Sequence, residues 1–270
     1  MAGCATVDEQ NRTELAVQSR LRRWRSAVKS SRSFWFIKRF LKRISGRELW
    51  IRRDTQQRTR HSDGWDYAPA SLRPGSIVYA FGVGDTLAFE LNLIARHGVV
   101  VHTFDPTPSA LTWIKTQDLP NDLHFHPWAV AGSQGALSLY PRLVKRRRSK
   151  LTMWTIDPRQ AGEAAAIDVP ACTIASAMQA LGHDQVDLLK LDVEGAEYDA
   201  ISAMLMDAVL PTQLLVEFHH RFPGIGKQRT RACLHALREV GYRIFSVSRT
   251  GRELSLVRTV TKPSESRPTC

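Results

Sequence analysis

Three side chains suited to acid–base chemistry follow two apolar runs in the second half of the chain. Asp192 follows the run Val186–Leu191, Glu217 lies near the end of the next run, Gln213–Phe218, and His219 directly follows that run. If both runs are strands of one parallel sheet, their carboxyl ends share the edge where ligands bind. Alternation along a strand places Glu217 and His219 on the same side. A histidine that titrates near neutral pH beside carboxylates suits general-base catalysis, although such side chains also simply brace one another.

Two further carboxylates, Glu194 and Glu197, open the stretch that follows Asp192. Carboxylates in the first turn of a helix are stabilised by the helix dipole. The sequence therefore explains both without giving them a role in a site.

A glycine-containing turn earlier in the chain is the second candidate site. Phe81 is followed by Gly82, Val83, Gly84 and Asp85, which lead into a helical pattern. Glycines let the backbone approach a ligand closely, and the first turn of a helix offers free N–H groups. Because the motif lacks the third glycine of the dinucleotide-binding fingerprint, an ordinary tight turn remains an alternative.

An acidic residue after the next apolar run makes this turn more informative. Asp105 stands 21 positions after Gly84, close to the roughly 20 residues that separate a glycine-rich turn from the acid that binds a ribose. The alternative is that Asp105 caps a helix or closes an Asx turn. Trp128, after a third run, is suited either to stack on an adenine or to belong to the core.

A sheet must bring these residues together, and the body of the chain has the pattern of one. From Ser76 on, short apolar runs alternate with helical stretches, which predicts a doubly wound, mostly parallel α/β sheet covered on both faces. The expected strands are residues 77–81, 99–104, 123–130, 186–191, 213–218, 242–248 and 254–260, and the expected helices are 86–97, 108–117, 173–181, 196–208 and 228–240. The last two strands have no helix between them, which predicts an antiparallel edge. A β-hairpin is expected from residues 136–140 and 151–156, with the basic run Lys145–Arg148 at its tip.

Composition places the chain among globular proteins. Of its 270 residues, 43% are hydrophobic and 24% are charged, which excludes fibrous and wholly disordered classes. The four cysteines are scattered without a CxxC pair, which argues against a zinc ribbon or a disulfide scaffold and for a reducing compartment. The sequence contains no apolar run near the roughly 18 residues that span a bilayer and no signal-peptide core, so we expect a cytoplasmic protein.

The positive charge is concentrated ahead of this body. Residues 1–64 hold 16 Lys and Arg residues against 6 Asp and Glu residues, a balance of +10 out of the net +12. Apolar and aromatic residues recur at helical spacing among the basic residues of 15–45, which predicts one or two amphipathic helices. Three interpretations remain open: a helix docked on the body, peripheral adsorption to an anionic inner-membrane surface, and, least favoured, contacts with nucleic-acid phosphates.

The expected domain organisation follows from this charge distribution. It consists of a basic helical extension over residues 1–64, the α/β body over 65–260 and a disordered polar tail over 261–270.

One segment has the character of a known family signature. Leu188–Glu197, which reads Leu-Leu-Lys-Leu-Asp-Val-Glu-Gly-Ala-Glu, closely resembles the signature of the FkbM family of S-adenosylmethionine-dependent methyltransferases. Val169–Ile174, the hairpin, and Phe81–Asp85 followed by Phe104–Pro108 also fit that family. The resemblance covers residues 75–260 and implies a Rossmann-like seven-stranded methyltransferase fold. It also implies methyl transfer, typically to a hydroxyl group of a sugar, glycan or natural product.

The resemblance further implies roles for individual residues. Gly82 and Gly84 would flank the methionine part of the cofactor, and Asp105 would hold its ribose hydroxyls. Trp128 and its neighbour would border the adenine, and Asp192 would lie beside the transferred methyl group. The cofactor-binding residues implied in this way are Gly82, Val83, Gly84, Asp85, Asp105, Trp128, Ala129 and Asp192.

For the reaction itself, we expect Asp192, Glu217 and His219 to surround an acceptor hydroxyl, with His219 or Asp192 as the base. A magnesium ion held by Asp192 and Glu217 is a variant of this site, because carboxylate oxygens suit magnesium. Ala80 stands where many members of the family carry an acid, and Asp85 or Glu90 would compensate.

Two other function classes remain open. In one, the body is a nicotinamide-dependent oxidoreductase, against which the incomplete glycine fingerprint argues. In the other, the chain is a catalytically silent, membrane-associated binding protein that keeps the methyltransferase fold, which the basic aromatic N-terminal region favours. A nucleic-acid partner is not expected, since the sequence resembles no base-reading module.

Overall fold

The computed structural model describes residues 36–37, 40–41, 43–46, 48–142, 153–160 and 165–259. Its contacts divide the chain into two compact units, Met1–Trp50 and Ile51–Cys270. The larger unit thus begins upstream of the boundary expected at residue 65. The run Lys145–Arg148, most of the expected N-terminal helices and the tail 261–270 lie outside the described residues.

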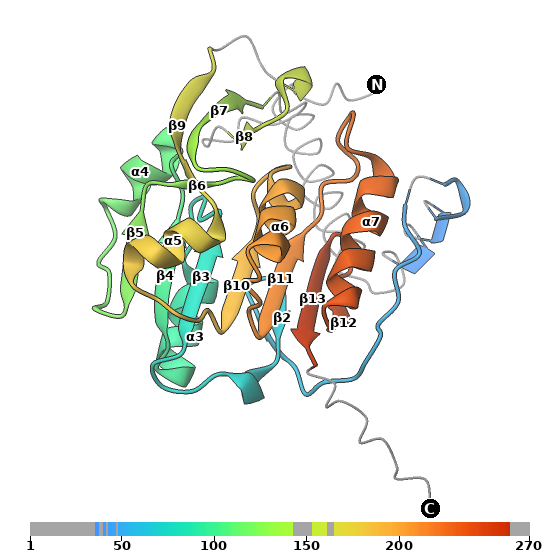
Figure 1. The fold of residues 1–270 in the computed structure, drawn as a ribbon, viewed down its shortest axis with the longest axis horizontal. Helices are drawn as coiled ribbons and strands as arrows, with labels where there is room; N and C mark the ends of the chain where they lie inside the picture. The colour runs from blue at the N-terminus through green and yellow to red at the C-terminus, as the bar shows by residue number, and fades with distance from the viewer. Residues whose placement is uncertain are drawn as a thin grey trace, which may run out of the picture. The chain divides into compact units, whose positions relative to one another are not determined.

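Within the described residues, the larger unit is built on a seven-stranded sheet (Figure 1). Five strands run parallel: β3 (Ile77–Phe81), β4 (Val100–Phe104), β5 (Leu123–His126), β10 (Leu188–Leu191) and β11 (Gln213–Glu217). The strands β13 (Glu253–Arg258) and β12 (Tyr242–Val247) add an antiparallel edge. The order is β12-β13-β11-β10-β3-β4-β5, which confirms the predicted doubly wound sheet.

Helices link the strands and cover the sheet. They are α3 (Ala88–His97), α4 (Pro108–Ile114), α5 (Ile174–Leu181), α6 (Glu197–Met206) and α7 (Gly226–Glu239), of which α5, α6 and α7 lie on the face turned to the viewer in Figure 1. On the face that α3 covers, Val78, Val101 and Leu188 of the sheet pack with Phe89 and Leu93 of α3. Apolar residues that recur with a period of 2 residues indicate a strand, and those with a period of 3.6 residues indicate a helix. These buried residues are part of the patterns from which the strands and the helix were predicted.

The ends of two helices follow directly from local sequence. The Thr173 hydroxyl accepts the Ser176 N–H, and the Ser176 hydroxyl lies 2.9 Å from the Thr173 backbone nitrogen, a reciprocal capping box that starts α5. Gly182 ends α5 at φ +71°, and Gly98 ends α3 at φ +62°. Glycine adopts this left-handed conformation without the steric cost of a Cβ atom.

A second sheet lies beside the first. In the described residues it contains β6 (Ala129–Val130), β9 (Ile167–Cys172), β7 (Gly135–Pro141) and β8 (Trp154–Thr155), in that order across the sheet. The pairing of β7 with β8 confirms the predicted hairpin. The single strand expected over residues 123–130 is two strands, because Pro127 and Trp128 separate β5 from β6, which joins the second sheet.

β9 and a short hairpin ahead of the main sheet are not among the elements predicted from the sequence. Pro170 argues against a strand, yet it lies one position before β9 begins to pair with β6 at Ala171. The hairpin consists of β1 (Arg60–Ser62) and β2 (Trp65–Tyr67). Asp63 and Gly64 join its strands at φ +42° and +86°, as a type I′ turn requires, so this Asp-Gly pair was the available signal.

One face of the main sheet carries ring side chains in aligned positions. The first row is Tyr79, His102 and His124, and the second is Phe81, Phe104 and His126. His102 Nδ1 lies 3.0 Å from His126 Nε2, and the ring of His183 meets that of His102 edge-on at 4.6 Å. Burial, together with His183, His126 and His124, lowers the pKa of His102 to about 3, and burial with the neighbouring histidines lowers the pKa of His126 to about 4. Both imidazoles are therefore neutral in the folded protein at neutral pH.

This cluster makes folding sensitive to acid. Below the ordinary histidine pKa of 6.5 the unfolded chain takes up a proton on residue 102, whereas the folded chain does so only near pH 3. The free energy of unfolding therefore falls as the pH drops through this window, with His102 accounting for about 3 kcal/mol between about pH 7 and pH 4. We expect His102→Gln to flatten this dependence in urea unfolding series, while His235→Gln, at an exposed position, leaves it unchanged. Equal slopes for His102→Gln and the wild type would contradict the assignment.

Candidate functional site

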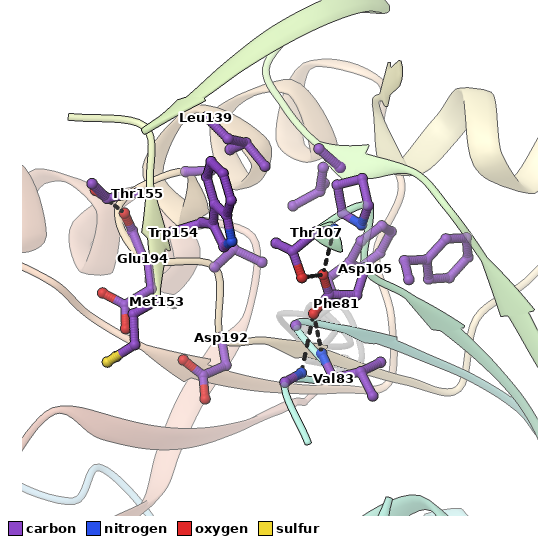
Figure 2. Close-up of a pocket in the computed structure, with 18 of the residues that line it drawn as sticks. Phe81, Val83, Asp105, Thr107, Leu139, Met153, Trp154, Thr155, Asp192 and Glu194 are labelled. Carbon is purple, nitrogen blue, oxygen red and sulfur yellow. Dashed lines mark hydrogen bonds between the residues drawn. The ribbon is translucent and has the colours of Figure 1, made fainter. Parts of the chain in front are cut away.

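A pocket of about 530 Å³ opens at the carboxyl ends of β3, β4 and β10 (Figure 2). The strand order reverses there, because β4 lies on one side of β3 and β10 on the other. Ligands of open α/β sheets bind at such a point. All eight residues expected to bind a cofactor line the pocket: Gly82, Val83, Gly84, Asp85, Asp105, Trp128, Ala129 and Asp192.

The backbone of Gly82 passes unusually close to the end of β10. Its N–H donates to the Phe104 carbonyl at 2.9 Å, and the Asp192 N–H donates to the neighbouring Phe81 carbonyl at 3.0 Å. A Cβ atom on Gly82 would lie 1.9 Å from the Asp192 carbonyl oxygen, and Gly82 has φ +88°. Both the conformation and the lack of space require glycine at this position.

Asp105 fixes the glycine turn from the other side. One carboxylate oxygen accepts the N–H groups of Val83 and Gly84, both at 3.0 Å, and the other accepts the N–H and hydroxyl of Thr107 at 2.9 and 2.6 Å (Figure 2). The local Asx-type contact expected as an alternative is thus present together with the contact to the turn. A carboxylate accepts about four hydrogen bonds, so these donors satisfy Asp105.

Asp192, Glu217 and His219 come together at one edge of the pocket. One oxygen or nitrogen atom from each lies within 4.8 Å of those from the other two. Asp192 lines the pocket, whereas Glu217 and His219 are buried and are not among the described residues that line it. The trio predicted from the strand ends is therefore assembled, with Asp192 as the member exposed to the pocket.

His219 is held in place by Glu197. His219 donates its backbone N–H to Glu197 Oε1 at 2.8 Å, and its Nδ1 lies 3.3 Å from the same oxygen. The other oxygen of Glu197 accepts the Gly195 N–H at 2.9 Å, and the residue is fully buried. The helix-dipole explanation of Glu197 was therefore incomplete, because this carboxylate points into the site and orients a histidine.

The surroundings of His219 favour its charged form. Burial alone would lower the pKa of His219, but the hydrogen bond and charge of Glu197, with the charges of Glu194 and Glu217, raise it to about 9. The imidazole thus departs from the near-neutral pKa assumed from the sequence.

The neighbouring carboxylates are also perturbed. Burial and the negative charge of Asp192 raise the pKa of Glu217 to about 8, and burial raises that of Glu194. Nearby cations act in the opposite direction, because Arg252 lies 2.5 Å from Glu217 and Arg142 lies 2.8 Å from Glu194. The site therefore concentrates carboxylates that two guanidinium groups partly neutralise.

Glu90 does not compensate for Ala80 in the way expected from the sequence. It accepts a hydrogen bond from Lys190 Nζ at 3.1 Å, and both side chains are buried. Although burial lowers the pKa of Lys190, the charges of Glu90 and Asp192 raise it overall, so the lysine is charged. Glu90 is thus committed to a structural ion pair and is not among the described residues that line the pocket, whereas Asp85 lies there at an exposed position.

The second sheet forms a wall of the pocket that the sequence analysis did not assign. In Figure 2, Leu139 and Trp154 of this sheet and the adjoining Met153 lie across the cavity from the glycine turn, and Thr155 donates its hydroxyl hydrogen to the Glu194 carbonyl at 3.1 Å. The Trp154 Nε1 atom is buried and has no hydrogen-bond partner among the described residues. The hairpin itself was predictable, but its position over the pocket depends on how the two sheets pack.

A comparison with protein families shows to which family this chain belongs. The model described as the Methyltransferase FkbM domain matches residues 76–244. The chain belongs to the FkbM methyltransferase family. The FkbM match includes the glycine turn, Asp105, Asp192, Glu217 and His219, which confirms the resemblance noted in the sequence.

Two curated relatives of this FkbM chain are probable methyltransferase-like protein 24 from two mammals. The human protein is 28% identical over 153 residues, which cover 54% of this chain and 33% of the relative. The Rattus norvegicus protein is 26% identical over 189 residues, covering 66% and 44%. The chain thus spans between a third and less than half of the length of these relatives.

The solved structures that match are more distant in sequence. The Methanococcus jannaschii fibrillarin pre-rRNA processing protein has a TM-score of 0.40 at 9% identity, with 78% of this chain and 86% of that chain covered. A TehB-like SAM-dependent methyltransferase from Corynebacterium glutamicum has a TM-score of 0.34 at 12% identity, with 70% and 84% covered.

The close passage of Gly82 generates a matched pair of substitutions. A Cβ atom on Gly75, at the similar φ of +81°, would meet no described atom within 4 Å. We expect Gly75→Ala to lower the free energy of unfolding by about 1–2 kcal/mol, the cost of the backbone conformation alone. Gly82→Ala adds the clash with the Asp192 carbonyl and should cost at least about 2 kcal/mol more. Urea unfolding measures both values, and equal losses would show that the Gly82 contact is not tight.

Proposed function

We propose that the pocket binds S-adenosylmethionine and that the protein transfers the methyl group to a hydroxyl oxygen of a sugar, glycan or natural product. The observation that carries this proposal is the placement of Asp105 and Asp192 in one pocket, on either side of the Gly82–Gly84 turn. Family membership supports the reaction class, and the acceptor class follows from the family resemblance.

The residues present suit a nucleoside cofactor. The added Cβ atom of Gly84 would meet no described atom within 4 Å, so the turn is open where a ligand must approach. Asp105 supplies carboxylate oxygens for ribose hydroxyls, which would replace donors now provided by Thr107. Trp128 is half-buried against Phe104 and His126, with ring centroids at 6.0 and 5.1 Å, and so offers a supported ring for an adenine.

Asp192 is the residue that we assign to the acceptor proton. The bound cofactor supplies an activated methyl group on a sulfonium centre. The protein must then align the acceptor and remove its hydroxyl proton as the oxygen–carbon bond forms. Of the predicted trio, Asp192 is the member that lines the pocket, while Glu217 and His219 lie buried beside it. We therefore assign Asp192 as the base and the buried pair as residues that position it.

Calorimetry and turnover test this function separately. We expect S-adenosylhomocysteine to bind with micromolar Kd and NAD to show no binding. Asp192→Asn should leave the Kd for S-adenosylhomocysteine within about threefold and reduce labelled-methyl transfer to a panel of hydroxyl acceptors by roughly 10²–10³-fold. Asp207→Asn, at an exposed position, serves as the matched control.

Each alternative function gives a different result in these assays. Preferential binding of NAD would replace the methyltransferase proposal with the oxidoreductase. Cofactor binding without transfer to any acceptor would favour the silent binding protein. Undiminished transfer by Asp192→Asn would remove this residue from the mechanism.

We also propose that the smaller unit binds an anionic membrane surface peripherally. The exposed large apolar side chains of its described residues are Phe36, Ile37, Phe40, Leu41, Ile44 and Trp50. Basic residues alternate with them, and the Arg43 guanidinium lies 4.9 Å from the Trp50 ring centroid. Apolar side chains with interspersed Lys and Arg suit adsorption at the interface of anionic lipids. No described helix has the length and apolarity needed to cross a bilayer.

Vesicle pelleting tests this surface in the full chain. We expect binding to vesicles that contain phosphatidylserine, weaker binding to phosphatidylcholine alone, and release at about 0.5 M salt. Replacing both Phe40 and Leu41 by Ser should reduce pelleting about tenfold. Met206→Ser, which removes an exposed apolar side chain of the larger unit, should not. Equal pelleting with anionic and neutral vesicles, or equal pelleting of the wild type and the double variant, would argue against membrane binding through this surface.

A further inference from the structure

We propose that Asp192, Glu217 and His219 form a binding site for a divalent transition-metal ion of the Mn²⁺ or Zn²⁺ class. The proposal concerns a site beside the cofactor pocket, and its test does not require methyl transfer. It differs from the magnesium variant drawn from the sequence, because an imidazole nitrogen joins the two carboxylates.

The geometry of the three ligands supports a shared ion. One donor atom from each residue lies within 4.8 Å of the others, and His219 Nε2 is 3.8 Å from Glu217 Oε1. An ion about 2.1 Å from each donor holds adjacent donors about 3 Å apart and opposite donors about 4.2 Å apart. Small side-chain rotations bring the three donors to coordinating distance, with the Glu217 oxygen turning from Arg252 toward the ion.

The second observation is a buried nitrogen without a hydrogen-bond partner. His219 is 2% exposed, and its Nε2 has no hydrogen-bond partner among the described residues. The nearest carboxylate oxygens belong to Glu194, at 3.6 Å, and Glu217, at 3.8 Å, both beyond hydrogen-bonding distance. A buried polar atom left in this way is costly unless something binds it. It points into the space between the carboxylates.

Glu197 prepares this nitrogen to bind a cation. An ionised carboxylate only accepts hydrogen bonds, so the contact between Glu197 Oε1 and His219 Nδ1 assigns a proton to Nδ1. In the neutral imidazole Nε2 then carries the lone pair. A carboxylate that accepts from the rear nitrogen of a histidine is the usual arrangement behind a metal ligand, and it fixes the orientation of the ring. A cation and a proton compete for Nε2.

The donor set selects the class of ion. Imidazole suits zinc, iron and related metals, whereas magnesium and calcium prefer sites made of oxygen alone. Manganese accepts both donor types. An ion with three protein ligands would keep further coordination positions for water or a bound molecule, and Asp192 lines the cofactor pocket. Asp192 can bind the ion through one oxygen and keep the other for the acceptor.

Metal binding to the full-length protein tests this site directly. After treatment with EDTA and desalting, the loss of the free Mn²⁺ electron paramagnetic resonance signal measures binding. We expect one Mn²⁺ per chain with a Kd near 10 µM or below, displacement by Zn²⁺, and at least about tenfold weaker competition by Mg²⁺. His219→Ala and Asp192→Ala should weaken binding at least about tenfold, and Glu197→Gln by about 10–100-fold. His235→Ala, at an exposed histidine, should not change it.

Several outcomes would overturn the site. Wild-type protein that binds neither Mn²⁺ nor Zn²⁺ below about 1 mM has no such site. Competition by Mg²⁺ as strong as Mn²⁺ binding would exclude the imidazole as a ligand, and this measurement needs no variant. Undiminished binding by His219→Ala, with a wild-type circular dichroism spectrum, would place the ion elsewhere. Binding of S-adenosylhomocysteine is measured independently, so failure of the cofactor proposal and failure of the metal proposal are distinguished.

Discussion

The arrangement of the site depends on the contact between the Gly82 backbone and the Asp192 carbonyl. There β3 and β10 end side by side, joined by the hydrogen bond from the Asp192 N–H to the Phe81 carbonyl, and the space between them excludes a Cβ atom. The position of Asp192 relative to the glycine turn is thus determined by main-chain packing. Because Asp105 binds the same turn through two N–H groups, the two carboxylates are held on either side of one backbone segment.

Much of this arrangement could be predicted because its signals are local. Apolar runs and helical periodicity identify the strands and helices, and parallel strands necessarily end at one edge of their sheet. That topological rule was enough to predict that Asp192, Glu217 and His219 meet and that Asp105 and the glycine turn lie nearby. The confirmed hairpin of β7 and β8 was likewise visible in short-range patterns.

The errors arose where a residue's role depends on a partner far along the chain. Glu197 is an ordinary residue type for the first turn of a helix. Its hydrogen bonds with His219 depend on the pairing of β11 with β10, which local sequence does not reveal. Glu90 pairs with Lys190, 100 positions away, so its distance from the pocket could not be read from its neighbours. Pro170 argued against predicting β9. A strand accommodates a proline only at certain positions, and here that depends on where the pairing of β9 with β6 begins. Local sequence constrains backbone conformation more strongly than it constrains side-chain partners.

The wall that faces the glycine turn is formed by one continuous segment of the chain. The strands β6 to β9 fall within residues 129–172, between β5 and α5, whereas Gly82, Asp105 and Asp192 follow strands of the main sheet. Substitutions in this segment can therefore change the wall without moving the residues on the opposite side of the cavity. Under the proposed function, differences in acceptor preference between relatives would arise in this segment, and exchanging it between relatives would change the substrate range.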